Sequence, residues 1–227
     1  MINKSQILSF KNNGYVILKK YISKNKIKIL KNEIEKIAKK HQIQNIFSHK
    51  KNSFWKNNFK QLDDLRLELS YKNKIFNNFF NTKLFFSDTS RIKNKKSKKF
   101  KVDKIRFNIP TFKNKLHPWH QDEITWPNKI KQNPVTFWVP LVDVDENNGI
   151  EFAKLDKKSN SLLAHELGKD PRTKLKYATF KNKKILKKTF IPSLKIGDVL
   201  IFDAFLPHRS CLNKTQKIRI SIDTRFK

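Results

Sequence analysis

The first hundred residues carry apolar side chains at intervals of three and four, the spacing of an amphipathic helix. The clearest such stripe follows Ser23, a favourable N-cap residue, and predicts a helix that continues to about residue 40. We expect the stripe to pack into the core; its members are Ile27, Leu30, Ile34, Ile37 and Ala38. Weaker patterns predict helices over residues 4–12 and roughly 61–81. Between the first two helices, Gly14 marks a break, and the apolar run YVIL predicts a strand over Tyr15–Ile22.

The pattern changes after residue 101 to short runs of β-branched and aromatic residues separated by turn signals. These runs predict strands over Val102–Ile109, Trp119–Thr125, Pro134–Val142, Gly149–Phe152, Lys188–Ile191, Asp198–Phe202 and Ile218–Thr224. Helices followed by many short strands predict an α+β chain whose second half is a sandwich or barrel. No repeat or flexible linker interrupts the sequence, so we expect one domain over 1–227, mainly helical in 1–100 and β-rich in 101–227.

The chain is strongly basic, but its charge is unevenly distributed. Among 227 residues, 51 Lys and Arg oppose 19 Asp and Glu, giving a formal net charge of +32. Only seven of the basic residues are Arg, although bidentate phosphate contacts favour Arg, and the chain is also rich in Asn, Ile and Phe. We therefore attribute most of the charge to an AT-rich coding composition. Basic runs occupy 91–101, which we expect to be a solvated loop, and 172–188, whereas 117–153 holds two Lys against six acidic residues.

Cysteine content and hydropathy exclude several classes of protein. A single cysteine, Cys211, rules out a disulfide scaffold and a zinc site built from cysteines, and we expect this thiol to be buried. No apolar run approaches the ~20 residues that a membrane-spanning helix requires. The first ten residues lack the apolar stretch of a secretory signal, so the expected location is cytoplasmic.

Candidate chemistry centres on two histidines and a carboxylate. His120 and Asp122 fall on a predicted strand, where residues i and i+2 point to the same face. His208 follows the predicted strand Asp198–Phe202, and two His plus one carboxylate form a triad that holds Fe(II) with open coordination positions. Arg219 follows His208 by 11 positions and can grip a dicarboxylate through its planar fork. The His-x-Asp spacing alone is a weak signal, and the acidic context strengthens it.

Three sequence stretches resemble a known enzyme family: HPWHQDEITWP (117–127), NPVTFWVPLVDVDENNG (133–149) and GDVLIFDAFLPHRSCLNKTQKIRIS (197–221). Together with NGYVILKKYIS (13–23), they are similar to the phytanoyl-CoA dioxygenase family of Fe(II)- and 2-oxoglutarate-dependent oxygenases. The resemblance implies a double-stranded β-helix, or jelly roll, with N-terminal helices packed on it. It also implies hydroxylation of a small organic substrate by O2, with release of succinate and CO2.

The resemblance assigns roles to individual residues. It implies that iron binds His120, Asp122 and His208, and that Arg219 and Ser210 hold the distal carboxylate of 2-oxoglutarate. Trp138 and Asn108 match cosubstrate-pocket positions of some relatives, although core packing explains Trp138 equally well. Halogenating relatives lack the triad carboxylate, so its presence favours hydroxylation. The stretch IEFAKLDKKSN (150–160) departs from the family pattern near the substrate mouth, which leaves the substrate's identity open.

Other interpretations compete with this one. A degenerate jelly roll that binds nucleic acid or an anionic surface would explain the Lys runs, but not the intact triad with Arg219. Zn(II) on the same ligands would leave Arg219 and Ser210 without a purpose. We read His117 and His165 as loop histidines and Asp143 and Asp145 as turn residues. We expect a small-molecule partner and no specific nucleic acid, and an anionic substrate would be favoured if the basic run 172–188 borders the site.

Overall fold

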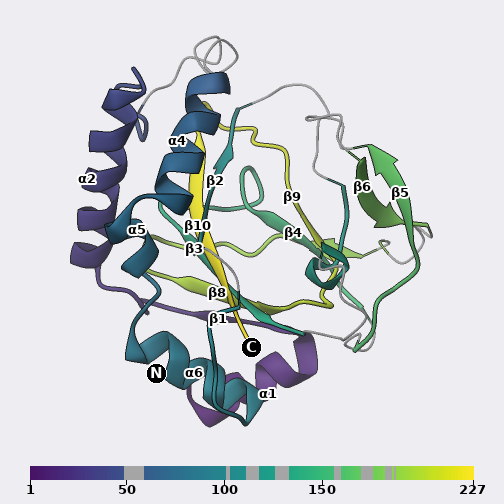
Figure 1. Cartoon of the computed structure of the whole chain (residues 1–227). Coiled ribbons are helices and arrows are strands. Elements are labelled where there is room, and N and C mark those ends of the chain that lie inside the picture. Colours follow the sequence, from purple (N-terminus) through teal and green to yellow (C-terminus); the bar gives the residue numbers. More distant parts are fainter. Residues whose placement is uncertain are drawn as a thin grey trace.

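The structure of the protein is a computed structural model, and Figure 1 shows its arrangement of helices and strands. It describes residues 1–48, 59–100, 103–110, 118–125, 133–155, 160–169, 176–181, 186 and 188–227. His117 and about half of the basic run 172–188 (172–175, 182–185 and 187) therefore lie outside the described residues. No helix in this described part combines the length and apolar character needed to cross a membrane.

The largest sheet among the described residues is antiparallel and has the strand order β1-β8-β3-β10-β2. Its strands are β1 (Tyr15–Leu18), β8 (Val199–Asp203), β3 (Val135–Pro140), β10 (Arg219–Phe226) and β2 (Lys104–Asn108). Because β1 pairs with β8 along its whole length, the N-terminal part of the chain contributes a strand to the sheet of the β-rich half.

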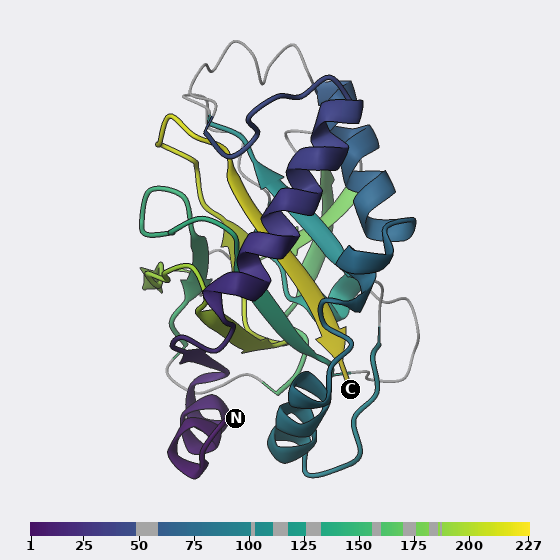
Figure 2. The same ribbon diagram turned by 90° about the vertical axis from the view of Figure 1, so that its left-hand side faces the viewer.

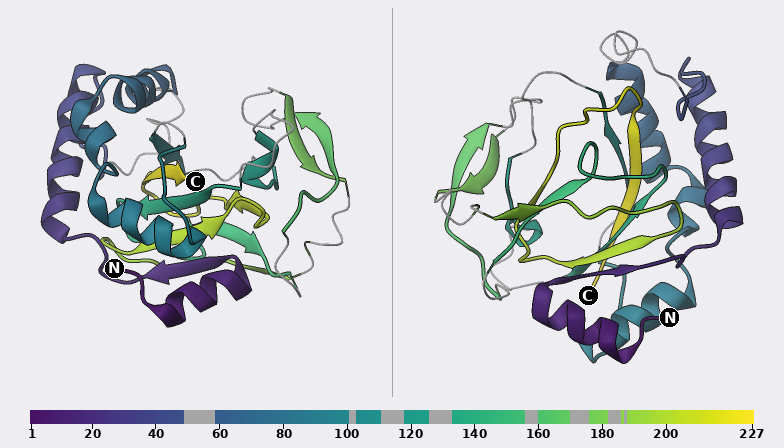
Figure 3. Two further views of the ribbon diagram at one scale, coloured as in Figure 1. Left: turned by 60° about the horizontal axis from the view of Figure 1, so that its bottom comes forward. Right: turned by 180° about the vertical axis from the view of Figure 1, so that it is seen from behind.

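Two smaller antiparallel sheets complete the β-structure of the described chain. One has the order β7-β4-β9, formed by β7 (Thr189–Phe190), β4 (Ile150–Ala153) and β9 (His208–Ser210). The other is the hairpin of β5 (His165–Lys169) and β6 (Lys176–Phe180), which lies on the opposite side of the molecule from helices α2 (Lys24–Lys40) and α4 (Phe59–Tyr71) (Figures 1 and 3). This mixed fold with antiparallel sheets matches the predicted α+β jelly roll.

Helices cover one face of the large sheet, as Figure 2 shows for α2 and α4. Their bounds are α1 (Lys4–Asn13), α2 (Lys24–Lys40), α4 (Phe59–Tyr71), α5 (Lys74–Asn78) and α6 (Lys83–Lys93). Ser23 caps α2 by accepting a hydrogen bond from the Lys26 amide, and the predicted apolar stripe of α2 is buried. It joins a cluster that contains Ile105, Ile220 and Ile222 from the sheet. The sheet face under the helices is therefore apolar.

Several predicted boundaries were wrong. The helix expected over 61–81 is two helices, because the chain breaks between Tyr71 and Lys74. Part of the loop expected over 91–101 is the end of α6, whose buried Ile92 anchors it to the core. The strand expected over Trp119–Thr125 is a single bridge at His120 followed by the 3₁₀ helix η1 (Asp122–Thr125). The chain turns there because the Glu123 amide donates to the Ala204 carbonyl and does not pair with a neighbouring strand.

A tight turn at Gly197 leads into β8 and is hydrogen-bonded to Ile22, which lies between β1 and α2. The φ of Gly197 is +97°, and the Ile22 amide donates to the Gly197 carbonyl at 2.9 Å. A Cβ at this position would lie 2.8 Å from the Ile22 carbonyl oxygen.

Gly197→Ala should therefore lower the free energy of unfolding by about 1–3 kcal/mol, as expected for a strained backbone. Urea denaturation measures the loss; a variant as stable as the wild type would contradict this geometry.

Candidate metal and cosubstrate site

Two imidazoles meet where His120 pairs with β9. The backbones of His120 and His208 exchange two hydrogen bonds of 3.1 and 2.9 Å, which sets their rings side by side with centroids 4.4 Å apart. Each ring has its Nδ1 2.9 Å from a carbonyl two residues earlier, that of Pro118 or Leu206. If each Nδ1 carries the proton, both Nε2 atoms are left as electron-pair donors, the arrangement that metal-binding histidines use.

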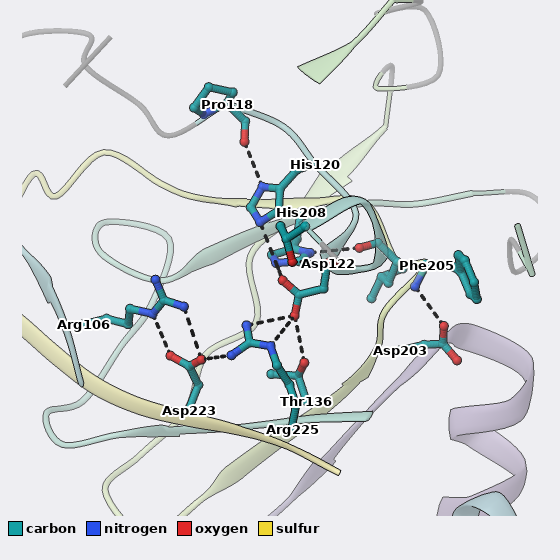
Figure 4. Close-up of polar contacts among 12 residues, drawn as sticks. Arg106, Pro118, His120, Asp122, Thr136, Asp203, Phe205, His208, Asp223 and Arg225 are labelled. Atoms are coloured by element: carbon teal, nitrogen blue, oxygen red, sulfur yellow. Dashed lines mark hydrogen bonds and ion pairs between the residues drawn. The ribbon is translucent and has the colours of Figure 1, made fainter. Parts of the chain in front are cut away.

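Asp122 completes the cluster from the start of η1 (Figure 4). Its Oδ1 lies 3.8 Å from the Nε2 atom of His120 and 3.8 Å from that of His208. All three side chains are buried, and their ligand atoms lie within 4.8 Å of one another. Two imidazole nitrogens and one carboxylate oxygen, converging on one point from one side, suit a ferrous ion that keeps further positions open. The donor set therefore fits the predicted metal.

The other carboxylate oxygen of Asp122, Oδ2, is hydrogen-bonded to Arg225 and Thr136. Oδ2 accepts hydrogen bonds from Arg225 Nε at 3.1 Å, Arg225 Nη2 at 2.9 Å and Thr136 Oγ1 at 2.9 Å. Burial by itself raises the pKa of Asp122, but the charge of Arg225, the two histidines and the Thr136 hydrogen bond outweigh it and hold that pKa well below its usual range. Asp122 is thus ionised and oriented.

Arg219 lies on the same face of β10 as Arg225 and is almost completely buried. Its Nε donates to the Asn148 carbonyl at 3.1 Å, its Nη1 to Ser221 Oγ at 2.9 Å and its Nη2 to Ser210 Oγ at 3.4 Å. The guanidinium carbon lies 5.6 Å from the centre of the Trp138 ring. These contacts fix a planar, charged fork inside the sheet, suited to a carboxylate.

The remaining predicted pocket residues adjoin Arg219 in different ways. Ser210 contacts it directly, and Trp138 is buried beside it. Asn108 is opposite Arg219 in the β2–β10 register, and its side-chain amide donates to the Cys211 carbonyl at 2.9 Å. The structure therefore gathers these residues around Arg219, and Asn108 also ties β2 to the segment after β9.

Gln121, between the two ligand candidates, anchors the turn. It is fully buried; its Nε2 donates to the Ser161 and Phe205 carbonyls at 3.1 and 2.6 Å, and its Oε1 accepts from the Leu163 amide at 2.8 Å. The segment that carries His120 and Asp122 is thereby joined to two distant parts of the chain. Sequence reasoning had assigned Gln121 no role.

Other residues considered from the sequence stay outside the cluster. His165 is on a strand rather than in the expected loop, and its ring packs on Phe180 with centroids 4.5 Å apart. Cys211 is buried as predicted, which raises the pKa of its thiol to about 11. Asp143 accepts hydrogen bonds from Lys195 and from the Ile196 amide at a turn.

Sequence reasoning also missed Thr136 and Arg225, both in contact with Asp122. One signal for Arg225 was available: the segment RISIDTRF alternates polar and apolar residues for almost its full length, so Arg225 shares a face with Arg219. The predicted strand stopped at Thr224, two residues before the end of β10 and one residue before Arg225.

Comparison with solved structures gives the same fold at low sequence identity. EvdO2 from Micromonospora carbonacea var. aurantiaca, complexed with 2-oxoglutarate, has a TM-score of 0.68 and 14% identity, covering 100% of this chain and 91% of that one. EctD from S. alaskensis, with 2-oxoglutarate and 5-hydroxyectoine, has a TM-score of 0.68 and 14% identity, covering 100% and 76%. The epimerase SnoN, in complex with Fe3+, alpha ketoglutarate and nogalamycin RO, has a TM-score of 0.61 and 14% identity, covering 98% and 82%.

Sequence comparison identifies the family. No curated protein matches the chain. The family model for phytanoyl-CoA dioxygenase (PhyH), in contrast, matches residues 10–221, which include the three candidate metal ligands and Arg219. The chain belongs to the phytanoyl-CoA dioxygenase family, as its motifs predicted.

Proposed function

We propose that the protein is an Fe(II)- and 2-oxoglutarate-dependent dioxygenase that hydroxylates a small organic substrate and releases succinate and CO2. The main support is that His120 Nε2, His208 Nε2 and Asp122 Oδ1 converge on one point, as the ligands of a single metal ion would. The chain also belongs to a family of such oxygenases. Three of the similar structures were solved with 2-oxoglutarate, or with Fe3+ and alpha ketoglutarate, which supports the same cofactors here.

Different residues would bind the metal and the cosubstrate. Bound iron would supply the activation of O2, with 2-oxoglutarate as the source of two electrons, chemistry that no side chain performs. His120, His208 and Asp122 would hold the metal from one side, and Arg219 would bind the far carboxylate of 2-oxoglutarate. Ser210 and Ser221 orient the Arg219 guanidinium for that contact.

Burial of the site serves the same reaction. His120, Asp122 and His208 are each at most 6% exposed, so little bulk water reaches them in the folded protein. Exclusion of water protects a reactive intermediate from side reactions. The carboxylate Asp122 occupies the position that halogenating relatives leave to a small residue, which supports hydroxylation.

Substrate class, location and domain extent are further parts of the proposal. An anionic substrate remains our prediction from the basic run 172–188, which the structure describes only in part. We also propose a cytoplasmic location and one domain over 1–227. The pairing of β1 with β8 supports a single domain, because it ties the N-terminal part into the large sheet.

Anaerobic addition of Fe(II) and 2-oxoglutarate tests the metal site. We expect the weak visible charge-transfer band of a chelated 2-oxoglutarate complex in the wild type. His120→Ala removes one of three protein ligands and should abolish the band. Absence of the band in folded wild-type protein, or a band of full strength in His120→Ala, would contradict the assignment.

Cosubstrate binding is tested separately through Arg219. Arg219→Met should weaken 2-oxoglutarate binding roughly 100-fold, because the far carboxylate loses its charged, buried partner. Calorimetric titration of the Fe(II)-loaded protein under nitrogen gives the Kd. The matched control is Arg209→Met: Arg209 also lies by a Trp ring, that of Trp119 at 4.8 Å, but it is bonded to Glu151 rather than Ser210. Equal Kd values for the two variants would overturn the role of Arg219.

A further inference from the structure

Four alternating charges run from the edge of the large sheet to the metal-ligand candidate Asp122 (Figure 4). Arg225 contacts Asp122 with Nε and Nη2 and contacts Asp223 with Nη1. Asp223 in turn accepts from Arg106 Nε at 2.8 Å and from Arg106 Nη2 at 3.4 Å. The order is therefore Arg106, Asp223, Arg225, Asp122.

The inner part of this row is out of water. The side chains of Asp122, Asp223 and Arg225 are 4%, 3% and 9% exposed, whereas Arg106 is 46% exposed. Transferring charges into the interior costs several kcal/mol per ion, and apolar residues of similar volume often give equal or greater stability. Stability alone is thus a weak reason for three buried charges in one row, and the contact of Arg225 with Asp122 suggests a second reason.

Geometry supplies that reason. A free carboxylate can bind a metal with either oxygen or with both. Here Oδ2 of Asp122 already accepts three hydrogen bonds, from Arg225 twice and from Thr136, while Oδ1 faces both imidazoles. The planar guanidinium contacts Oδ2 through two of its nitrogens, so it restricts rotation of the carboxylate. Only Oδ1 is left for a metal ion.

Charge balance explains Asp223. A guanidinium beside a metal ligand repels a divalent cation and draws electron density from the carboxylate. Asp223 offsets that charge, because it contacts Arg225 on the side away from Asp122. Arg106 then pairs with Asp223 at the edge strand β2, where its own charge is half exposed and screened.

We propose that Arg225, with its charge balanced by Asp223, is a positioning residue that makes Asp122 a metal ligand through one oxygen. This inference rests on the proposed function, since it concerns the metal site of that function. It predicts that Arg225 sets metal affinity and ligand geometry, whereas Arg219, on the same face of the same strand, sets cosubstrate affinity.

The test is titration of the metal-free protein with Co(II) in the absence of 2-oxoglutarate, followed by the visible absorption of the bound ion. Arg225→Met should weaken Co(II) binding about 10–100-fold, the range known for residues that orient metal ligands. It should also change the Co(II) spectrum, because only Thr136 then holds Oδ2 and the Asp122 carboxylate can rotate more easily. Arg225→Lys keeps the positive charge but loses the planar guanidinium, so we expect a Co(II) Kd between those of the wild type and Arg225→Met.

Two control variants separate this role from a structural one. Lys99→Met breaks another ion pair to a buried carboxylate, Lys99–Asp103, and should lower the melting temperature while leaving the Co(II) Kd unchanged. Arg219→Met should leave Co(II) binding within about twofold of the wild type, since the orienting effect requires direct contact with a metal ligand. Circular dichroism establishes that each variant is folded before it is titrated.

The outcomes are distinct. A folded Arg225→Met protein with the wild-type Kd and spectrum would overturn the inference and leave the proposed function intact. Absence of Co(II) binding to the wild type would instead overturn the proposed function. If Arg225→Met does not fold, Asp223→Asn takes its place: it leaves the Arg225 charge unbalanced and should weaken Co(II) binding severalfold. Wild-type affinity in folded Asp223→Asn would contradict the proposal.

Discussion

The alternation of the last strand, β10, is the constraint on which the fold and the site both depend. Its odd-numbered residues, Arg219, Ser221, Asp223 and Arg225, are polar, whereas Ile220, Ile222 and Phe226 belong to the core under the helices. Every residue of the strand is buried, so the polar face needs hydrogen-bond and ion-pair partners, whereas the apolar face needs apolar neighbours. A shift of one residue in register would place the charged residues in the apolar core, which fixes the pairing of β10 with β2 and β3.

The same strand carries the two arginines of the proposed site. Arg219 and Arg225 are six residues apart on one face, and they have different partners: two serines and a carbonyl for Arg219, and two carboxylates for Arg225. The two serines and the carbonyl therefore orient the Arg219 guanidinium, whereas Arg225 forms ion pairs with Asp122 and Asp223. The net charge of +32 obscures this division, since it comes mainly from lysines, while the positive charges at the site belong to arginines.

Sequence reasoning predicted the parts of the molecule that depend on local patterns. The helix after Ser23, the strands that pair in the large sheet and the two histidines with Asp122 were predicted from periodicity, spacing and family resemblance. It missed features that depend on distant contacts. Asp122 contacts Arg225, 103 positions away in the sequence. The 3₁₀ helix η1 forms where a strand was expected, because the Glu123 amide donates to the carbonyl of Ala204, directly after β8. The β5–β6 hairpin was also missed, since His165–Lys169 contains a glycine and charged residues that obscure a strand pattern.

The most direct measurement of the central claim is a crystal structure of the protein with Mn(II) and 2-oxoglutarate, in which anomalous scattering locates the metal. We expect one ion bound by His120 Nε2, His208 Nε2 and a single oxygen of Asp122. The far carboxylate of 2-oxoglutarate should bind Arg219, and Arg225 should still donate to the second oxygen of Asp122. A metal ion bound elsewhere, or a cosubstrate that does not reach Arg219, would contradict this expectation.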